Sequence, residues 1–189
     1  MRSEIFISVD VETDGPIPDE YSMLSLGAYA PQRPDMSFYV EFKPYSNNFV
    51  PEALNVSGLD RAILDRDGYF PATGMKRFDL WINAICQGGY KPVFVGFNAT
   101  FDWSFVNWYF HKFLKKNPFG ISGLDIKALY MGALNKSMWA ETAKRNMDKS
   151  FLSTSPHTHN ALDDAREQAE ILVKVMAQMG HSLKPIPFS

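Results

Sequence analysis

Two carboxylates near the start of the chain could bind a metal ion together. Asp10 and Glu12 stand two positions apart, and because side chains alternate across a strand, both would point to the same face. The run from Ile5 to Val11 contains Asp10 and leads directly to Glu12. It is otherwise almost wholly apolar, as in a strand buried on both faces. Such acids repel one another and are poorly solvated, and a divalent cation with oxygen ligands would compensate. The alternative is an exposed strand end that carries two hydrated acids.

A third acid lies at a strand-to-helix junction. Asp102 ends the motif Asn98-Ala99-Thr100-Phe101-Asp102, which follows an expected strand over residues 91–97. We expect Asn98 to cap a helix over residues 99–116. Asp102 would then lie near its first turn, at the carboxyl end of the preceding strand, where ligands of open α/β sheets gather. The alternative role for Asp102 is a favourable interaction with the helix dipole.

The last group opens a late helix, expected over residues 161–179. Asn160 is the expected N-cap and Asp163 its capping-box partner, which leaves Asp164 without a structural role. His159 precedes the helix on a loop, and an imidazole near a metal site suits proton transfer. The alternative for His159 is a hydrated loop side chain.

Strands and helices must position these groups. Their expected order, strands first and then strands alternating with helices, predicts a mixed α/β architecture in which helices cover a central sheet. Further strands are expected over residues 23–30, 37–42 and 124–126, and further helical segments after Pro51 and over residues 60–64, 75–86, 127–134 and 137–148. Residues 181–189 contain two prolines and are expected to be irregular. A length of 189 residues without repeats or long linkers indicates one domain over residues 1–189.

Composition excludes several classes of protein. The single cysteine, Cys86, rules out an intrachain disulfide framework and a multi-cysteine zinc site. No signal-peptide pattern and no membrane-spanning apolar run is present, so we expect a cytoplasmic protein that does not interact with membranes. The net charge of -2 carries no global signal for a nucleic-acid partner.

The order of the three motifs closely resembles that of the DEDDh 3′→5′ exonucleases of the RNase H-like superfamily, which include RNase T, oligoribonuclease and proofreading polymerase subunits. A histidine five residues before the last aspartate marks the DEDDh branch. Other segments are also similar to the family's sequences: Ser25-Leu26-Gly27-Ala28, Pro51-Glu52-Ala53, Val56-Ser57-Gly58-Leu59 and Leu124-Asp125-Ile126. The resemblance spans nearly the whole chain and implies an RNase H-like mixed central β-sheet flanked by α-helices.

The resemblance also implies a metal-dependent hydrolase that releases nucleoside 5′-monophosphates from 3′ ends. Two divalent cations, Mg²⁺ or Mn²⁺, would clamp the attacking and leaving oxygens. The ligands would be Asp10, Glu12, Asp102 and Asp164, with His159 as the general base. His157 and His159 could instead form an imidazole metal pair, but the surrounding acids favour a hard oxygen site. Neutralising the four ligand carboxylates changes the net charge from -2 to +2, which suits short or single-stranded ends of DNA or RNA rather than long duplexes.

Substrate contacts are expected from the segment after Glu12 and from the helix that carries Asp102. In the family, the segment that corresponds to residues 13–17 grips the terminal nucleotide, so Thr13 is a candidate binding residue, as is Phe101 beside the third acid. The family commonly has threonine where Asp14 stands and a large apolar residue where Pro16 stands. Ile17 could supply that apolar wedge instead.

Aromatic and basic residues along the chain leave several roles open. The helix expected over residues 99–116 carries seven aromatic residues, which could form core, a homodimer interface or a base-stacking platform: Phe101, Trp103, Phe105, Trp108, Tyr109, Phe110 and Phe113. Two clusters of cations could meet phosphates or could be hydrated surface charges: Lys112, Lys115 and Lys116, and Lys144, Arg145 and Lys149.

Two other functions compete with a 3′→5′ exonuclease. One is a different metal-dependent nuclease on the RNase H-like scaffold, such as an endonuclease, which the Asp-x-Glu pair would equally serve. The spacing of His159 and Asp164 favours the exonuclease. The other is a catalytically silent nucleic-acid-binding domain. The presence of all five expected catalytic residues argues against it.

Overall fold

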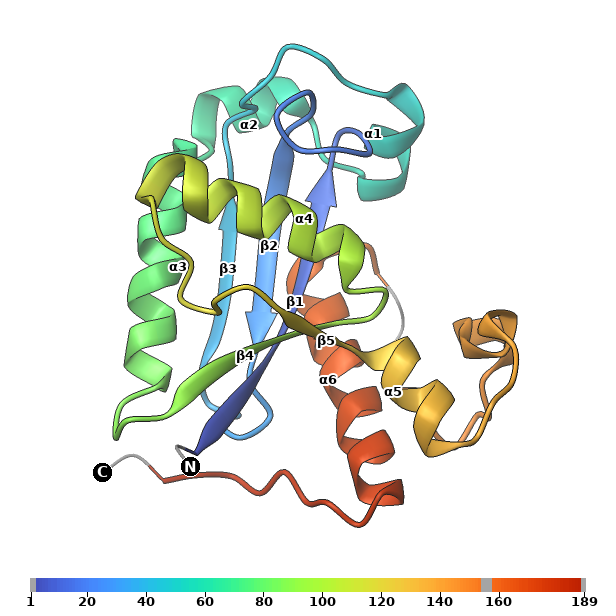
Figure 1. Ribbon diagram of the computed structural model, residues 1–189. Helices are drawn as coiled ribbons and strands as arrows, with labels where there is room; N and C mark the ends of the chain where they lie inside the picture. The colour runs from blue at the N-terminus through green and yellow to red at the C-terminus, as the bar shows by residue number, and fades with distance from the viewer. Residues whose placement is uncertain (1–2, 154–157, 188–189) are drawn as a thin grey trace.

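The computed structural model describes residues 3–153 and 158–187, and a five-stranded sheet in the order β3-β2-β1-β4-β5 forms its centre (Figure 1). The strands are β1 (Glu4–Thr13), β2 (Met23–Tyr29), β3 (Ser37–Glu41), β4 (Lys91–Gly96) and β5 (Gly123–Asp125). The pairs β1–β2 and β2–β3 are antiparallel, whereas β4 runs parallel to both β1 and β5. The sheet is therefore mixed, as expected.

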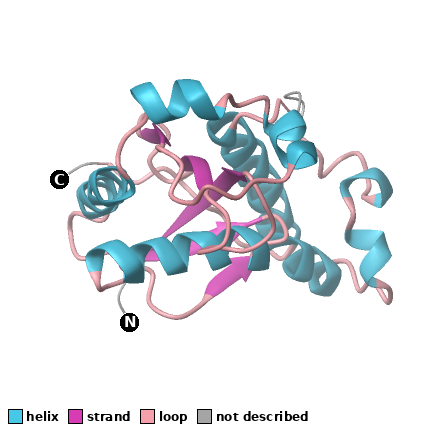
Figure 2. Cartoon of the chain, turned by 90° about the horizontal axis from the view of Figure 1, so that it is seen from above, coloured by secondary structure: helices cyan, strands magenta, loops and turns pink. Residues whose placement is uncertain are grey.

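Helices cover both faces of this sheet, as the view from above shows (Figure 2). They are α1 (Pro51–Ser57), α2 (Arg61–Asp67), α3 (Pro71–Ile85), α4 (Thr100–Tyr109), α5 (Ile126–Ala133) and α6 (Ala161–Gln178). Because β1 side chains alternate between faces, Ile7 and Val9 pack in a core with α3 and α4, while Phe6 packs in a second core with α5 and α6.

The aromatic helix belongs mainly to the core. It comprises α4 and a π-helical turn, η1 (Phe110–Leu114), and the side chains of Phe105, Tyr109 and Phe110 are fully buried. Three more aromatic residues are partly buried against the same core: Trp103, Trp108 and Phe113. Of the seven, Phe101 is the exposed one, at 37%. This packing favours the core alternative for most of the helix.

The structure differs from the sequence prediction at two expected helices. The helix expected from Met75 begins earlier, at Pro71, because the ring of proline suits the first helical position and its missing N–H costs no helical hydrogen bond there. The helix expected over residues 137–148 is wrong. Two short 3₁₀ turns, η2 (Trp139–Thr142) and η3 (Lys144–Asn146), replace it, because extended Ala143 interrupts them and little of the segment is buried to support a longer helix.

The C-terminal segment returns along the sheet without regular structure. Residues 181–187 form neither helix nor strand, and the backbone N–H of Ile186 donates to the carbonyl of Gln32 at 2.9 Å. Within the described residues, none of the helices has the length and apolar character needed to span a membrane.

Candidate active site

The carboxyl half of β1 presents Asp10 and Glu12 on one side of the sheet, where they pair with Gly27 and Ser25 of β2. On its other edge, β1 pairs with β4 only as far as Ser8. Beyond this point the N–H of Val11 donates to Oδ1 of Asp102 at 3.0 Å. Asp102 is thereby held against β1 between the two acids, and it lies in the first turn of α4, as expected.

The turn before α4 differs from the expected cap. Asn98 has a left-handed backbone (φ 70°), and the helix begins at Thr100, with Ala99 at the N-cap position. Asn98 therefore lies one residue before the N-cap position, and no side chain of the described residues caps the first turn of the helix, so that prediction is wrong. Asp125 orders the turn instead. Its Oδ2 accepts from Ala99 N–H at 2.6 Å, and its Oδ1 caps α5 through Ala128 N–H at 2.8 Å.

A glycine allows the start of α6 to reach the sheet beside Asp10. Gly27 lies opposite Asp10 in β2, and a Cβ at Gly27 would lie 2.2 Å from the carbonyl group of Ala161. The helix begins there with Asn160 as N-cap, whose side chain accepts from Leu162 N–H at 3.0 Å. This close approach requires glycine and places the first turn of α6 over the carboxylates of β1.

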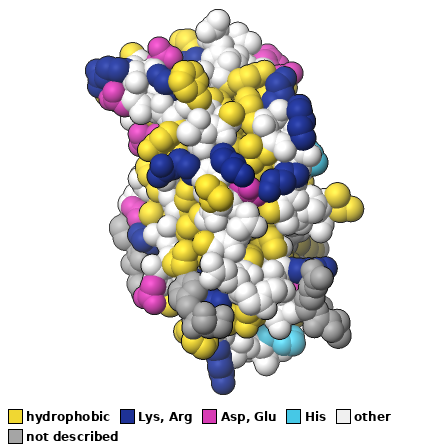
Figure 3. Space-filling model, turned by 90° about the vertical axis from the view of Figure 1, so that its left-hand side faces the viewer, with side chains coloured by type: hydrophobic (Ala, Val, Ile, Leu, Met, Phe, Trp, Pro, Cys, Tyr) yellow, Lys and Arg dark blue, Asp and Glu magenta, His cyan; other side chains and the backbone are white. Residues whose placement is uncertain are grey.

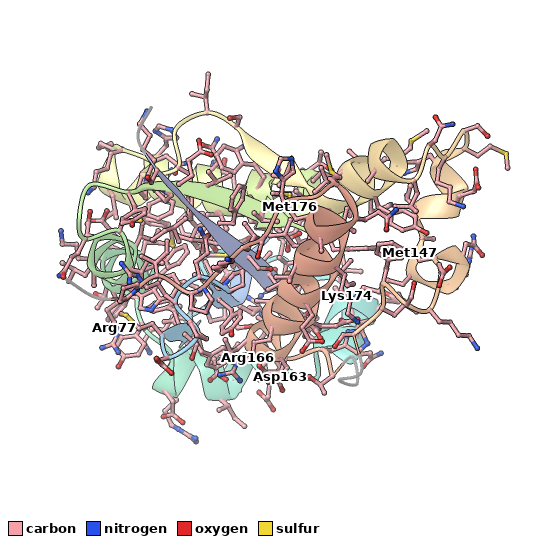
Figure 4. The ribbon with its side chains drawn as sticks, turned by 90° about the horizontal axis from the view of Figure 1, so that it is seen from below. Arg77, Met147, Asp163, Arg166, Lys174 and Met176 are labelled. Atoms are coloured by element: carbon pink, nitrogen blue, oxygen red, sulfur yellow. The ribbon has the colours of Figure 1, made fainter. Side chains whose placement is uncertain are left out.

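The two consecutive acids of α6 have different environments. Asp163 lies on the outer side of the helix, 3.6 Å from Arg166 (Figure 4), and it does not complete a capping box. The N–H of Asn160 donates to Oγ1 of Thr158 at 3.3 Å instead, so the capping-box prediction is wrong. Asp164 is 1% exposed, and its Oδ1 accepts from Thr158 N–H at 3.3 Å.

Glu12, His159 and Asp164 form a candidate metal centre. Each offers one ligand atom, and all three atoms lie within 4.8 Å of one another. His159 is exposed and has a left-handed backbone (φ 56°), so the loop delivers its imidazole to the buried acids from the solvent side. His157, the other candidate imidazole, lies outside the described residues.

Burial and mutual repulsion make the charged forms of these acids unfavourable. Burial, followed by the charges of Asp102, Glu12 and Asp164, raises the pKa of Asp10 well above its usual range. Burial and the charges of Asp164 and Asp102 raise the pKa of Glu12 to about 8. Burial raises the pKa of Asp102 to about 7. Four acids that share one poorly solvated site need positive charge, so their oxygen donors fit hard divalent cations.

Gln168 is a residue of the site that the sequence analysis missed. Its Nε2 donates to Oδ1 of Asp10 at 2.5 Å, and its Oε1 accepts from the N–H of Phe97 at 2.9 Å. These two bonds link α6 to β1 and to the turn that follows β4, and the Gln168 side chain is only 3% exposed. The sequence spacing could have identified it, because Gln168 stands four residues after Asp164 and therefore lies on the same face of α6.

The two predicted substrate-binding residues differ in exposure. Thr13 is buried, and its hydroxyl donates to the carbonyl of Gly15 at 2.9 Å, so its side chain shapes the loop after β1. Phe101 is 37% exposed, and its ring centre lies 5.4 Å from that of Phe105. Pro16 and Ile17, in the same loop, are both exposed.

Asp14, the residue that departs from the family's usual threonine, is fully buried in an ion pair with Arg61 of α2. It also accepts from the N–H of Ser22 at 2.5 Å. Arg61 donates further to the carbonyl of Ser46 at 2.6 Å. The pair therefore ties the loop after β1 to α2 and to the connector before α1.

Comparison with known proteins identifies the family. The RNase T exonuclease family model matches residues 7–172. The chain belongs to this exonuclease family. A 3′-5′ DNA exonuclease of Escherichia coli, Cap18, is 48% identical over 168 residues, which are 89% of this chain and 89% of Cap18. The family member described here is a 3′→5′ exonuclease of the DEDDh type.

Solved structures show the same RNase H-like fold. The nuclease domain of 3′hExo, a DEDDh family member bound to rAMP, has a TM-score of 0.71 at 16% identity, covering 99% of this chain and 98% of that domain. Pop2p of S. pombe, in its Mg²⁺- and Mn²⁺-bound form, has a TM-score of 0.64 at 14% identity, covering 91% of this chain and 82% of that one. The mixed-sheet architecture expected from the sequence is confirmed.

Proposed function

We propose that this exonuclease removes nucleotides one at a time from single-stranded or frayed 3′ ends of DNA and releases nucleoside 5′-monophosphates. The observation that carries the proposal is the convergence of Glu12, His159 and Asp164 within 4.8 Å, next to half-buried Asp10 and buried Asp102. The choice of DNA is supported by the 48% identity to Cap18, a DNA exonuclease. An RNA 3′ end remains the second candidate, since the similar 3′hExo domain binds rAMP.

Two divalent cations, Mg²⁺ or Mn²⁺, fit the donor set of the site. Their ligands would be the carboxylates Asp10, Glu12, Asp102 and Asp164. When bound, such ions neutralise developing charge on the phosphoryl oxygens and lower the pKa of coordinated water. The raised pKa values of Glu12 and Asp102 support this assignment. Burial is the main cause of both shifts, and the charges of Asp164 and Asp102 add to the shift of Glu12, so bound cations would stabilise the charged carboxylates.

The chain's own residues would orient the substrate and move the proton. His159, on the solvent side of the carboxylates, would accept the proton of the attacking water as general base. Thr13 would contribute through the loop that it shapes, and Phe101 would stack on a base beside Asp102. Gln168 would hold Asp10 in one orientation.

A ladder experiment tests this function. Single- and double-stranded DNA and RNA, labelled at the 3′ or the 5′ end, are incubated with Mg²⁺, Mn²⁺ or a chelator. We expect a ladder that shortens from the 3′ end with 5′-labelled single-stranded DNA, a labelled mononucleotide with 3′ label, and no reaction in chelator. Internal cleavage products, or full activity in chelator, would contradict the proposal.

We further propose that residues 1–189 form one exonuclease domain that acts in the cytoplasm. The family match over residues 7–172 and the single central sheet support one domain. The lone cysteine, Cys86, forms no disulfide, which suits a reducing compartment.

A further inference from the structure

Exposed aromatic side chains gather around the connectors that flank α1 and α2. Six aromatic side chains of the described residues are at least 36% exposed, and four of them lie in this region. These four are Tyr45, Phe49, Tyr69 and Phe70, with Phe70 the most exposed at 67%. Concentrated exposed apolar surface of this kind usually marks a contact site.

Each of these rings lies under a cation. Lys112 Nζ is 5.7 Å from the ring centre of Tyr45, Arg77 Cζ is 4.7 Å from that of Tyr69, and Lys43 Nζ is 5.4 Å from that of Phe70. Arg61 covers Phe49 at 5.2 Å, but it is already paired with Asp14. We define the basic-aromatic face by the other six residues: Lys43, Tyr45, Tyr69, Phe70, Arg77 and Lys112.

Hydrogen bonds and ring contacts tie residues of the basic-aromatic face to one another and to neighbouring elements. The N–H of Lys43 donates to the carbonyl of Tyr69 at 2.8 Å, which joins the end of β3 to the start of α3. The ring of Tyr45 meets Phe113 of η1 edge-on at 5.7 Å. The N–H of Tyr45 donates to Oγ of Ser22 at 3.0 Å, so the face continues into the loop held by Asp14 after the catalytic strand.

Positive charge dominates the adjoining α3 and η1. Figure 3 views the side of the molecule on which α3 lies in Figure 1, and Lys and Arg side chains form a band across it among hydrophobic ones. The acid of α3, Asp79, is buried and paired with Lys116 at 2.7 Å. Within the described part of the chain, neither Arg77 nor Lys112 has an acidic partner. The local surplus contrasts with the net charge of -2.

We propose that the basic-aromatic face binds the single-stranded stretch of the substrate that lies 5′ to the terminal nucleotides. This inference rests on the proposed function. It adds a binding surface for the part of the strand that lies outside the carboxylate site. Cations beside half-exposed rings suit this ligand, because phosphates pair with the cations while bases stack on the rings without regard to sequence. A folded protein partner is less suited to this face, because it offers no row of regularly spaced phosphates to the cations.

Fluorescence anisotropy in chelator tests the proposal without turnover. The probe is 5′-labelled oligothymidylate of about 20 nucleotides, long enough for a single-strand groove. Charge reversal in Arg77→Glu/Lys112→Glu should weaken binding about tenfold or more and reduce the salt slope of log Kd by about 1.4, since each phosphate contact contributes roughly 0.7. The matched control, Lys91→Glu/Lys184→Glu, makes the same charge change at exposed sites outside the face and should bind as wild type. Equal weakening in both variants, or in neither, would overturn the inference.

A second variant separates stacking from charge. Phe70→Ala should weaken binding of the same probe about fivefold without changing the salt slope, because stacking releases no counterions. Ile121→Ala, at a side chain that is 95% exposed elsewhere on the surface, is the control and should have no effect. Weaker probe binding in both variants would indicate nonspecific adsorption to apolar surface and would contradict a stacking role.

Hydrolysis of a labelled trinucleotide separates this inference from the proposed function. The substrate is too short to reach beyond the site, so Arg77→Glu/Lys112→Glu should hydrolyse it at the wild-type rate while hydrolysing the long strand more slowly at low substrate concentration. If the wild type binds the long strand through this face but hydrolyses nothing, the proposed function fails alone. If wild type and variant hydrolyse and bind the long strand equally, the basic-aromatic face fails alone.

Discussion

Gln168 on α6 donates a hydrogen bond to Asp10 on β1, with 2.5 Å between Nε2 and Oδ1. The other end of the same amide accepts from the N–H of Phe97 at the end of β4. One buried side chain thus connects Asp10, a proposed metal ligand, to the segment that follows β4. The bond also partly offsets the repulsion around Asp10, because a donated hydrogen bond favours its charged form.

Replacing Gln168 by leucine should lower kcat about 10- to 100-fold with a small change in KM, as expected for a positioning residue behind a metal ligand. Leucine has a similar volume but cannot hold Asp10. Steady-state kinetics on single-stranded DNA measure the effect. Gln178→Leu, at an exposed position at the end of the same helix, is the control. Unchanged kcat in the first variant would remove Gln168 from the site.

Asp10→Asn should reduce hydrolysis at least about 10³-fold, since the residue belongs to the proposed ligand set. Its effect on the metal-free fold should be neutral or stabilising at pH 8, because a repelled charge is removed and Oδ1 can still accept from Gln168. Activity assays and thermal melts in chelator measure both effects. Asp163→Asn, the same change on the outer side of α6, should retain activity. Substantial hydrolysis by Asp10→Asn would refute the metal assignment.

His159→Ala should lower turnover by about 10²- to 10⁴-fold, as for loss of a general base. The imidazole would act on the water, so stabilisation by Mn²⁺ in a thermal shift assay should remain close to that of wild type. His181→Ala, an exposed histidine of the C-terminal segment, should change neither quantity. Parallel loss of turnover and Mn²⁺ binding would show His159 to be a ligand rather than the base.

The metal-free protein should lose stability as pH rises from about 4 to about 8. Folding raises the pKa of Glu12 from 4.5 to about 8 and that of Asp102 from 3.8 to about 7. The folded state therefore binds more protons than the unfolded state in this window, so the free energy of unfolding falls as pH rises. Melting in chelator from pH 5 to 8 measures this decline.

Divalent cations should reverse that decline. Because the cations bind the deprotonated acids, the increase in Tm on adding Mg²⁺ or Mn²⁺ should be larger at pH 8 than at pH 5. Ca²⁺ serves as an oxygen-seeking comparison ion. A metal-induced shift that is equal at both pH values, or a metal-free Tm that rises with pH, would contradict the carboxylate cluster as the metal site.

Arg61→Met should cost about 3 kcal/mol of unfolding free energy, since it leaves the fully buried carboxylate of Asp14 unpaired. Asp14→Asn combined with Arg61→Met should recover most of that loss, because no buried charge remains. Urea denaturation measures both. Arg66→Met, which breaks the exposed ion pair with Asp67, should have a far smaller effect because solvent screens that pair. Equal losses for Arg61→Met and Arg66→Met would show that the Asp14 pair is not structurally important.

Local rules of backbone geometry account for the successful sequence predictions. Asp10 and Glu12 share a face because the side-chain period of a strand is two residues, and Asn160 caps α6 because its side chain reaches two N–H groups within three residues. The five catalytic candidates follow from such short motifs and their family order. None of these inferences needed contacts between distant parts of the chain.

Which distant groups meet depends on long-range packing. Gln168 contacts Asp10 across 158 residues and Asp102 contacts Val11 across 91, and both contacts depend on how closely α6 and α4 approach the sheet. Packing also explains why Asp125, and not Asn98, binds the backbone at the start of α4. Strand β5 brings the Asp125 carboxylate within hydrogen-bond distance of Ala99 N–H. The raised pKa values follow as well, since desolvation depends on the burial that packing creates. Short motifs were enough to name the acids and the histidine of this exonuclease, whereas packing sets their hydrogen-bond partners and shifts their pKa values.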